Sequence, residues 1–332
     1  MVEGSSVADA AGGGGDTGRL RPVRRRPRRA RAALIVLVAA VMAVGAILLA
    51  RGCGGGEAGA DAYRGLGAWV DVFDYVTAVG GSGAPVGPPD VDAMAAQGVR
   101  TLYLQAAFDA TALPGGLVPA NLVVPLLRRA HKRGLRVVGW YAPPLLRPDD
   151  DLARLIAIAR FDSGGERFDG IAVDIEDRQV ESAVVRNARV VDLSRRLRET
   201  LGAGATIGAI VLSPVLLEQV NPRFWPEFPW AAIRPLYDVW LPMAYWTDRL
   251  ASSGLAEPGP YVTRTVDRAR ELLGDANAPM HPIGGIGDRL TEAQLAEFAR
   301  ALPQLRAVGG SIYDYRTMPT GGWGVLRGRV PG

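Results

Sequence analysis

Two carboxylates, Asp174 and Glu176, alternate with aliphatic residues near the end of the segment "FDGIAVDIED" (168–177). Carboxylates are poor strand formers and are costly to bury without partners, so a strand that carries both on one face needs a reason for them. In a strand they would lie roughly 7 Å apart, because each residue rises about 3.3 Å. Like charges this close raise the pKa of one of them when water is partly excluded. A carboxylic acid that stays protonated near neutral pH can protonate the leaving oxygen of a glycosidic bond.

The alternation of side chains decides where these carboxylates point. Ala172, Asp174 and Glu176 share one face of the predicted strand, and the aliphatic residues between them share the other. An aliphatic face fits packing against helices. The carboxylate face is therefore predicted to point into a barrel.

Eight strand-like segments alternate with helical patterns after residue 62. They are residues 65–74, 99–108, 135–143, 168–176, 205–213, 237–246, 278–286 and 308–316. Helical patterns include residues 120–134, closed by Gly134, and residues 291–302, opened by a capping box from Thr291 to Gln294. This order predicts a (β/α)8 TIM barrel, although residues 317–332 are too short and glycine-rich for a full last helix. A doubly wound sheet would normally have fewer strands and a G-x-G-x-x-G loop, which does not follow the first strand.

Polar and aromatic side chains gather near the predicted carboxyl ends of these strands, where TIM barrels place their active sites. We expect catalytic roles for Asp174, Glu176 and Tyr245. Expected ligand-binding residues are Asp71, Asp74, Gln105, Trp140, Tyr141, Trp246, His281 and Asp314. Aromatic rings can hold the apolar faces of sugars. Trp225 and Trp230, in a proline-rich insertion, fit either such a platform or the packing of the loop itself.

Two of these segments resemble a known family. "DGIAVDIE" is similar to the D-x-x-D-x-D-x-E signature of family 18 glycoside hydrolases, the chitinase-like barrels, with Asp169, Asp174 and Glu176 matching and Ala172 in place of an aspartate. "PMAYW" is similar to their Met-x-Tyr-Asp segment, with Trp246 in place of the aspartate. The whole domain also resembles membrane-anchored actinobacterial barrel proteins of unknown activity.

The resemblance to family 18 implies roles for three residues. Glu176 would be the general acid, and Asp174 would orient the substrate 2-acetamido group, which acts as an internal nucleophile. Tyr245 would hydrogen-bond the carbonyl oxygen of that group. The implied function is an extracytoplasmic glycoside hydrolase that cleaves an N-acetylated envelope or environmental polysaccharide.

Three alternatives stay open at this point. A D-x-E pair at the end of the fourth strand also occurs in barrels resembling family 25 lysozymes, where Asp71 or Asp314 could assist. Arg178 or Arg316 could instead pair with Asp174 and Glu176, which would give the carboxylates a structural role. Finally, the changes at Ala172 and Trp246 suit a non-catalytic barrel that binds a glycan or a partner protein.

Cofactor and metal sites are not expected. The two histidines, His131 and His281, are far apart in the chain, and no metal-binding His or Cys pair occurs. No G-x-S-x-G elbow or Walker loop is present. The single cysteine, Cys53, excludes an intrachain disulfide.

Charge and hydropathy divide the chain into four predicted parts. Residues 1–31 form a disordered arginine-rich cytoplasmic tail, 32–50 a transmembrane signal anchor, 51–62 a flexible linker, and 63–332 the barrel outside the cell. Cleavage near Ala60 would instead release the barrel. Eight arginines lie between Arg19 and Arg31, and removing their charge from the net +4 leaves −4. The barrel is therefore not expected to bind nucleic acid, and the sequence leaves its oligomeric state open.

Overall fold

The computed structural model describes residues 60–80, 84–109, 113–319 and 321–332. Eight parallel strands follow one another around a closed barrel, in which β1 also pairs with β8. They are β1 (Gly65–Val70), β2 (Val99–Gln105), β3 (Arg136–Tyr141), β4 (Gly170–Ile175), β5 (Ile207–Leu212), β6 (Val239–Met243), β7 (Ile283–Ile286) and β8 (Gly309–Tyr313). Each lies within its predicted segment, so the predicted eight-stranded parallel barrel is confirmed.

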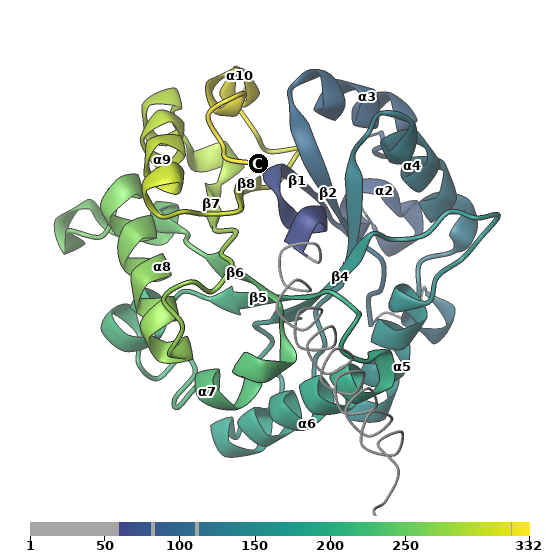
Figure 1. Cartoon of the computed structure of the whole chain (residues 1–332), viewed down its shortest axis with the longest axis horizontal. Helices are drawn as coiled ribbons and strands as arrows, with labels where there is room; N and C mark the ends of the chain where they lie inside the picture. The colour runs from purple at the N-terminus through teal and green to yellow at the C-terminus, as the bar shows by residue number, and fades with distance from the viewer. Residues whose placement is uncertain (1–59, 81–83, 110–112, 320) are drawn as a thin grey trace, which may run out of the picture. The chain divides into compact units, whose positions relative to one another are not determined.

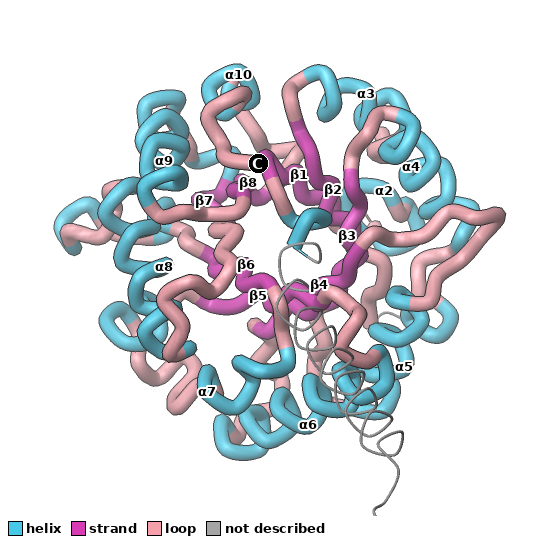
Figure 2. The backbone as a smooth tube through the Cα atoms, in the orientation of Figure 1, coloured by secondary structure: helices cyan, strands magenta, loops and turns pink. Residues whose placement is uncertain are grey.

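Helices form an outer ring around the strands (Figure 1), and Figure 2 shows the strands enclosed by that ring. They are α2 (Val72–Tyr75), α3 (Pro88–Ala96), α4 (Ala120–Lys132), α5 (Pro148–Ala159), α6 (Ala183–Leu201), α7 (Trp230–Ile233), α8 (Pro258–Leu273), α9 (Glu292–Gln304) and α10 (Gly322–Leu326). The predicted capping box from Thr291 to Gln294 opens α9. As expected, α10 is too short to complete the ring as the longer helices do.

Short helical turns complete the chain between these elements. They are η1 (Ala60–Tyr63), η2 (Thr77–Val79), η3 (Pro114–Gly116), η4 (Leu216–Val220), η5 (Arg234–Leu236), η6 (Trp246–Asp248), η7 (Ala251–Ser253) and η8 (Gly287–Arg289). Among them η4 is a single π-helical turn.

Aromatic residues fill the amino-terminal part of the barrel interior. Tyr63, from η1, is fully buried, and its hydroxyl donates to the carbonyl oxygen of Ile171 at 2.5 Å. Tyr103 stacks on Trp69 with ring centroids 4.2 Å apart. His281 Nδ1 lies 2.7 Å from the carbonyl oxygen of Tyr63 and 3.2 Å from the Tyr103 hydroxyl. These contacts close this end of the barrel, which we call the closed end.

The predicted anchor, residues 32–50, lies outside the described residues, as do the rest of residues 1–59. Within the parts of the chain that the structure describes, no helix has both the length and the apolar character that a membrane crossing needs. The structure therefore confirms the predicted barrel. The tail, the anchor and most of the linker stay predictions.

Candidate active site

A cavity of about 450 Å³ lies at the carboxyl ends of the strands. Six of the predicted site residues line it: Asp71, Gln105, Trp140, Asp174, Glu176 and Tyr245. They come from five different strands or from the residues directly after them. The structure therefore brings these six together from positions far apart in the sequence, at the end where TIM barrels carry their chemistry.

Asp174 and Glu176 enter this cavity from the end of β4. Asp174 pairs with Ile210 of β5 in the barrel and is only 7 % exposed, whereas Glu176 follows the last strand residue and is exposed. The Oδ1 atom of Asp174 is buried and has no hydrogen-bond partner among the described residues. Ala172, two residues earlier on the same face, is fully buried and offers no polar group. A buried acceptor without a donor is costly, so Asp174 is prepared to accept from a ligand.

The electrostatics of the pair favour protonated carboxyls. Burial raises the pKa of Asp174 well above its usual value, and the charges of Glu176 and Asp177 add to the rise. The pKa of Glu176 is also raised, first by the protein that surrounds it and then by the charge of Asp177. Because its side chain remains open to solvent, screening by water moderates this rise. Glu176 can therefore hold a proton and still reach a ligand.

Tyr245 lies beside the two carboxylates. Burial raises the pKa of its phenol well above 10, and the nearby charges of Glu176 and Asp174 raise it further. The phenol thus keeps its proton at neutral pH and can donate a hydrogen bond into the cavity.

Arg178 and Arg316 contact other residues and do not pair with Asp174 or Glu176. The alternative that these arginines give the two carboxylates a structural role is therefore wrong. Arg178 lies over the ring of Phe224 at 3.9 Å, and Arg316 Nε lies 3.0 Å from Asp74 Oδ1. Over the described ranges, neither Asp174 nor Glu176 forms an ion pair. The carboxylates are thus available to a ligand.

Asp71, Asp74 and Asp314 form a second carboxylate cluster, with one oxygen of each within 4.8 Å of the others. Asp71 and Asp74 cap the first turn of α2 reciprocally, and Asp71 also accepts from the Tyr313 hydroxyl at 2.9 Å. Burial and the neighbouring aspartates raise the pKa of Asp74 to about 7. Asp314 accepts from the Thr317 backbone amide at 2.9 Å, and burial raises its pKa too. Of the three, only Asp71 lines the cavity.

The expected absence of a metal stays a prediction. Although three oxygens converge in this cluster, each carboxylate already has partners within the protein: Arg316 for Asp74, Thr317 for Asp314, and Tyr313 for Asp71. These contacts give the three carboxylates a structural role, because they link the residues after β1 to the end of β8 and the residues that follow it.

Aromatic and amide groups form the walls of the cavity. The indole rings of Trp69 and Trp140 meet edge to face with centroids 5.8 Å apart. Gln105 is held by the backbone amide of Val72, which donates to its Oε1 at 3.0 Å. Rigid aromatic faces beside hydrogen-bonding groups are suited to sugars, whose rings carry both apolar and hydroxyl surfaces.

Five predicted ligand-binding residues do not line the cavity, which corrects the expectation. Asp74 and Asp314 belong to the carboxylate cluster described above. Tyr141, Trp246 and His281 lie elsewhere. The Tyr141 hydroxyl donates to Asp151 on α5, at 2.7 Å. Trp246 is 1 % exposed and packs on Phe298 of α9, with centroids 5.4 Å apart. His281 is fully buried at the closed end. Neighbouring residues of a strand point to opposite sides, so Tyr141 points out of the barrel while Trp140 points into it. Trp246 lies beyond the end of β6, in η6, where it packs against α9.

The aromatic insertion after β5 packs on itself. Phe228 contacts Trp225 and Trp230 with centroids 5.4 and 4.7 Å away, and all three are buried. Trp225 Nε1 also donates to Asn187 Oδ1. None of them lines the cavity, so the packing alternative is the correct one for this loop.

Several lining residues were not predicted, namely Trp69, Phe73, Phe108, Asp109, Ala142, Pro144, Asp177, Gln179, Ile210, Met243, Ile283 and Ile286. A signal existed for Trp69, which stands two residues before Asp71 and so points to the same side of the strand. Asp177 lies in the loop after β4 and carries no such signal. No periodicity extends into the loop after β4 that could have placed it.

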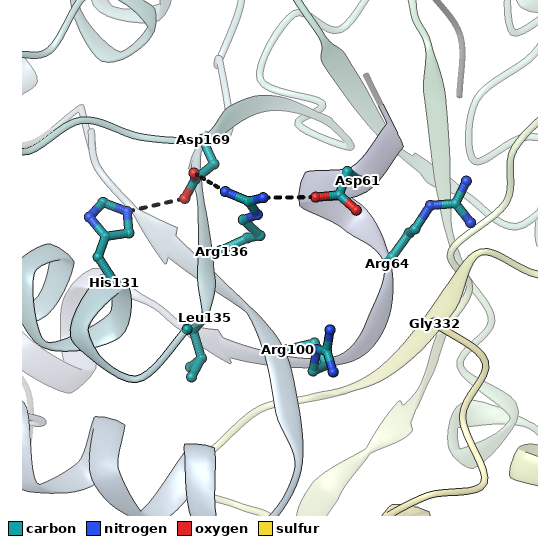
Figure 3. Close-up of a pocket in the computed structure, with 9 residues that line it drawn as sticks. Asp61, Arg64, Arg100, His131, Leu135, Arg136, Asp169 and Gly332 are labelled. Carbon is teal, nitrogen blue, oxygen red and sulfur yellow. Dashed lines mark hydrogen bonds and ion pairs between the residues drawn. The ribbon is translucent and has the colours of Figure 1, made fainter. Parts of the chain in front are cut away.

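A second cavity, of about 520 Å³, lies at the closed end (Figure 3). In it Arg136 bridges Asp61 and Asp169 at 3.0 and 3.2 Å, and His131 contacts Asp169 at 3.1 Å. Asp169 also accepts from the Val137 amide, which gives this first residue of the family-like motif a structural position far from Glu176. The charged groups largely satisfy one another, and the cavity lies opposite the end that carries TIM-barrel chemistry.

Comparisons with known proteins support the fold. No protein-family model and no curated protein sequence matches the chain. Among solved structures, the C-terminal domain of a putative chitinase from Desulfitobacterium hafniense has a TM-score of 0.57 at 10 % identity, over 80 % of this chain and 99 % of that one. A chitinase from Chromobacterium violaceum has a TM-score of 0.54 at 13 % identity, over 80 % and 98 %.

An enzyme with a different activity is equally similar in fold. The endo-beta-1,4-mannanase from Thermotoga petrophila has a TM-score of 0.56 at 9 % identity, over 76 % of this chain and 68 % of that one. Identities this low carry information on the fold alone. The described chain therefore has the TIM-barrel fold of glycoside hydrolases and resembles chitinases by structure.

Proposed function

We propose that this protein is a glycoside hydrolase that cleaves a polysaccharide containing N-acetylated sugars, with Glu176 as its acid and base. One observation carries the proposal: Glu176 is exposed and has no cationic partner among the described residues, beside the buried Asp174, in an aromatic-walled cavity at the carboxyl end of the barrel. Protein surroundings and Asp177 raise its pKa, as a general acid near neutral pH requires.

The orphan oxygen of Asp174 fits the acetamido group of such a substrate. The acetamido N–H would donate to Oδ1 of Asp174, and the Tyr245 phenol would donate to the acetamido carbonyl oxygen. Together these bonds would hold the carbonyl oxygen against the anomeric carbon of the same sugar, in a reactive geometry.

Two balanced steps then complete the reaction. First, the acetamido carbonyl oxygen attacks the anomeric carbon, the glycosidic C–O bond breaks, and the proton of Glu176 passes to the leaving oxygen. Second, a water molecule gives a proton to the Glu176 carboxylate and attacks the same carbon, which restores the acetamido group and the protonated acid. Two displacements at one carbon retain its configuration.

The first experiment is reducing-end release by the purified full-length chain. Chitin oligomers, peptidoglycan and other envelope glycans would be offered to the wild type and to Glu176→Gln. We expect release by the wild type and a loss of roughly 10²–10⁴-fold in the variant, which keeps the shape of the side chain but has no acid. Equal release by both proteins would remove Glu176 from the proposed role.

A binding protein without catalysis is the second candidate. Ala172 and Trp246 favour it, because both stand where the family-like motifs have aspartates and both are buried without a polar contact in the cavity. Glycan binding with no release from any substrate, unchanged in Glu176→Gln, would select this function.

We also propose, from the sequence pattern alone, that residues 32–50 anchor the chain in the cell membrane with the barrel outside. Protease added to intact cells would then digest the barrel and spare the arginine-rich residues before the anchor. Recovery of free barrel beginning near residue 61 in the medium would indicate cleavage instead.

A further inference from the structure

The cavity is acidic throughout. Five carboxylates line it, those of Asp71, Asp109, Asp174, Glu176 and Asp177, and none of the described lining residues is a lysine, arginine or histidine. Such a cavity attracts cations and repels anions, and its low-dielectric walls strengthen both effects.

One of the five carboxylates is already neutralised. Asp109 lies 3.0 Å from the guanidinium of Arg147 and 3.0 Å from that of Arg154. These two ion pairs balance Asp109 at the rim, so it adds little to the attraction of a ligand.

The other four carboxylates have uncharged partners or none within the described chain. Asp71 accepts from the Tyr313 hydroxyl and from backbone amides, and Asp177 accepts from the backbone and side chain of Gln179. Asp174 Oδ1 is buried, aims into the cavity and has no donor. Asp71 and Asp177, which have no cationic partner among the described residues, therefore leave room for a cationic group on the ligand.

The aromatic walls suit a cation as well as a sugar ring. Trp69, Trp140, Tyr245 and Tyr313 surround the carboxylates. The faces of such rings attract ammonium groups, and they also contact the C–H faces of sugars. A ligand that carries both features, a sugar ring and an ammonium group, matches the carboxylates and the rings at once.

We infer that the preferred substrate is a partly de-N-acetylated amino-sugar polymer, in which protonated amino groups meet Asp71 and Asp177 while one acetamido group meets Asp174. This inference rests on the proposed function and narrows its substrate. A fully acetylated polymer would fill the same cavity but leave these carboxylates without a counter-charge.

The test compares matched hexasaccharides in several linkages, one set fully N-acetylated and the other about half de-N-acetylated. Cleavage by the full-length wild type and calorimetric binding to Glu176→Gln would be measured at about 0.05 M and about 0.5 M salt. We expect a preference of about tenfold for the de-N-acetylated set at low salt, which falls at high salt because the attraction is electrostatic.

Two variants test whether the preference for the de-N-acetylated set arises from the carboxylates of the cavity. Asp177→Asn removes one lining charge, and we expect it to lower the preference, taken as the ratio of kcat/KM for the two sets, several-fold. A change in the acid Glu176 affects both sets alike and cancels in this ratio. Asp192→Asn removes one charge from the outer surface of α6, where Asp192 pairs with Arg195, and we expect no change. The pair separates a local effect from a change in net charge.

The outcomes distinguish the two proposals. Equal or better cleavage of the acetylated set would overturn the substrate inference and leave the hydrolase intact. Selective binding of the de-N-acetylated set without cleavage would support the inference and overturn the hydrolase. Failure to bind either set in any linkage would overturn both.

Discussion

Asp177 illustrates how one charge beside the proposed acid can set the working pH. Its negative charge raises the pKa of Glu176, so Asp177→Asn should lower that pKa. The acid must be protonated to act, and its activity is lost as the pH rises through its pKa. We therefore expect the alkaline limb of the kcat/KM profile to move to lower pH in Asp177→Asn and to stay in place in Asp192→Asn. A limb that moves to higher pH, or not at all, would contradict the assignment.

His281 should make stability depend on pH. Burial lowers its pKa to about 4, from an ordinary 6.5, although the carbonyl oxygen of Tyr63 opposes the shift. The unfolded chain therefore binds a proton between these values that the folded chain does not, and stability is lost as the pH falls from 6.5 toward 4. At about 1.4 kcal/mol per pH unit, the loss reaches about 3 kcal/mol.

The measurement is the free energy of unfolding by urea between pH 4 and pH 7, for the wild type and for His281→Asn. Other groups, such as Asp74, titrate in both proteins and contribute equally. We expect the difference between the two proteins to shrink as the pH falls. A difference that is constant with pH would contradict a lowered pKa of His281 in the folded protein.

The same residues show what the sequence could and could not reveal at this scale. Asp174 and Glu176 were predictable because their two-residue spacing fixes a common direction on a strand. Trp140 and Tyr141 were both assigned to the mouth, although adjacent residues cannot both point inward. His281 was placed at a strand end because the predicted segment began early, and β7 starts only at Ile283.

At the scale of elements, the packing of β7 depends on a residue without a side chain. A Cβ atom at Gly284 would lie 2.6 Å from Ile312 Cδ1 and 2.8 Å from Trp246. Gly284→Ala should therefore overpack the contact of η6 with β7 and β8 and lower the free energy of unfolding by about 1–3 kcal/mol. Gly324→Ala, in α10, is the matched control because its Cβ meets nothing within 4 Å. Chemical denaturation of the two variants checks the difference, and similar losses in both would contradict it.

The strands were the most predictable elements, since apolar residues dominate their buried runs and helical patterns separate them. The packing of η6 was less predictable. Trp246 directly follows Tyr245, which lines the cavity, and nothing in the local sequence reveals that α9 covers Trp246. Contacts between elements far apart in the chain decide such positions, and local patterns do not contain them.

At the scale of the whole molecule, Tyr63 joins η1, which precedes the first strand, to the strands opposite β1. Its hydroxyl donates to the carbonyl oxygen of Ile171 in β4, across the barrel interior. Tyr63→Phe leaves that contact unmade inside the closed end and should cost about 1–2 kcal/mol of unfolding free energy. Tyr315→Phe, which removes a longer and partly exposed bond to Asp90, should cost less. Equal costs would show that the closed end is not tied through this hydroxyl.

The resemblance of the whole barrel to chitinases confirms the fold that the sequence implied, while a mannanase of equal similarity shows that this fold serves different substrates. Function must therefore come from the six predicted residues that meet in the cavity and from those beside them.

Both ends of the described barrel lie at the closed end: Asp61, beside Ala60, and Gly332 line the same cavity there, opposite Glu176. A chip surface or affinity resin coupled through Gly332 would attach the barrel at the end opposite its acidic cavity. The orientation of an immobilised sample is thus built into the topology, and long polymers could be captured from solution without steric hindrance by the support.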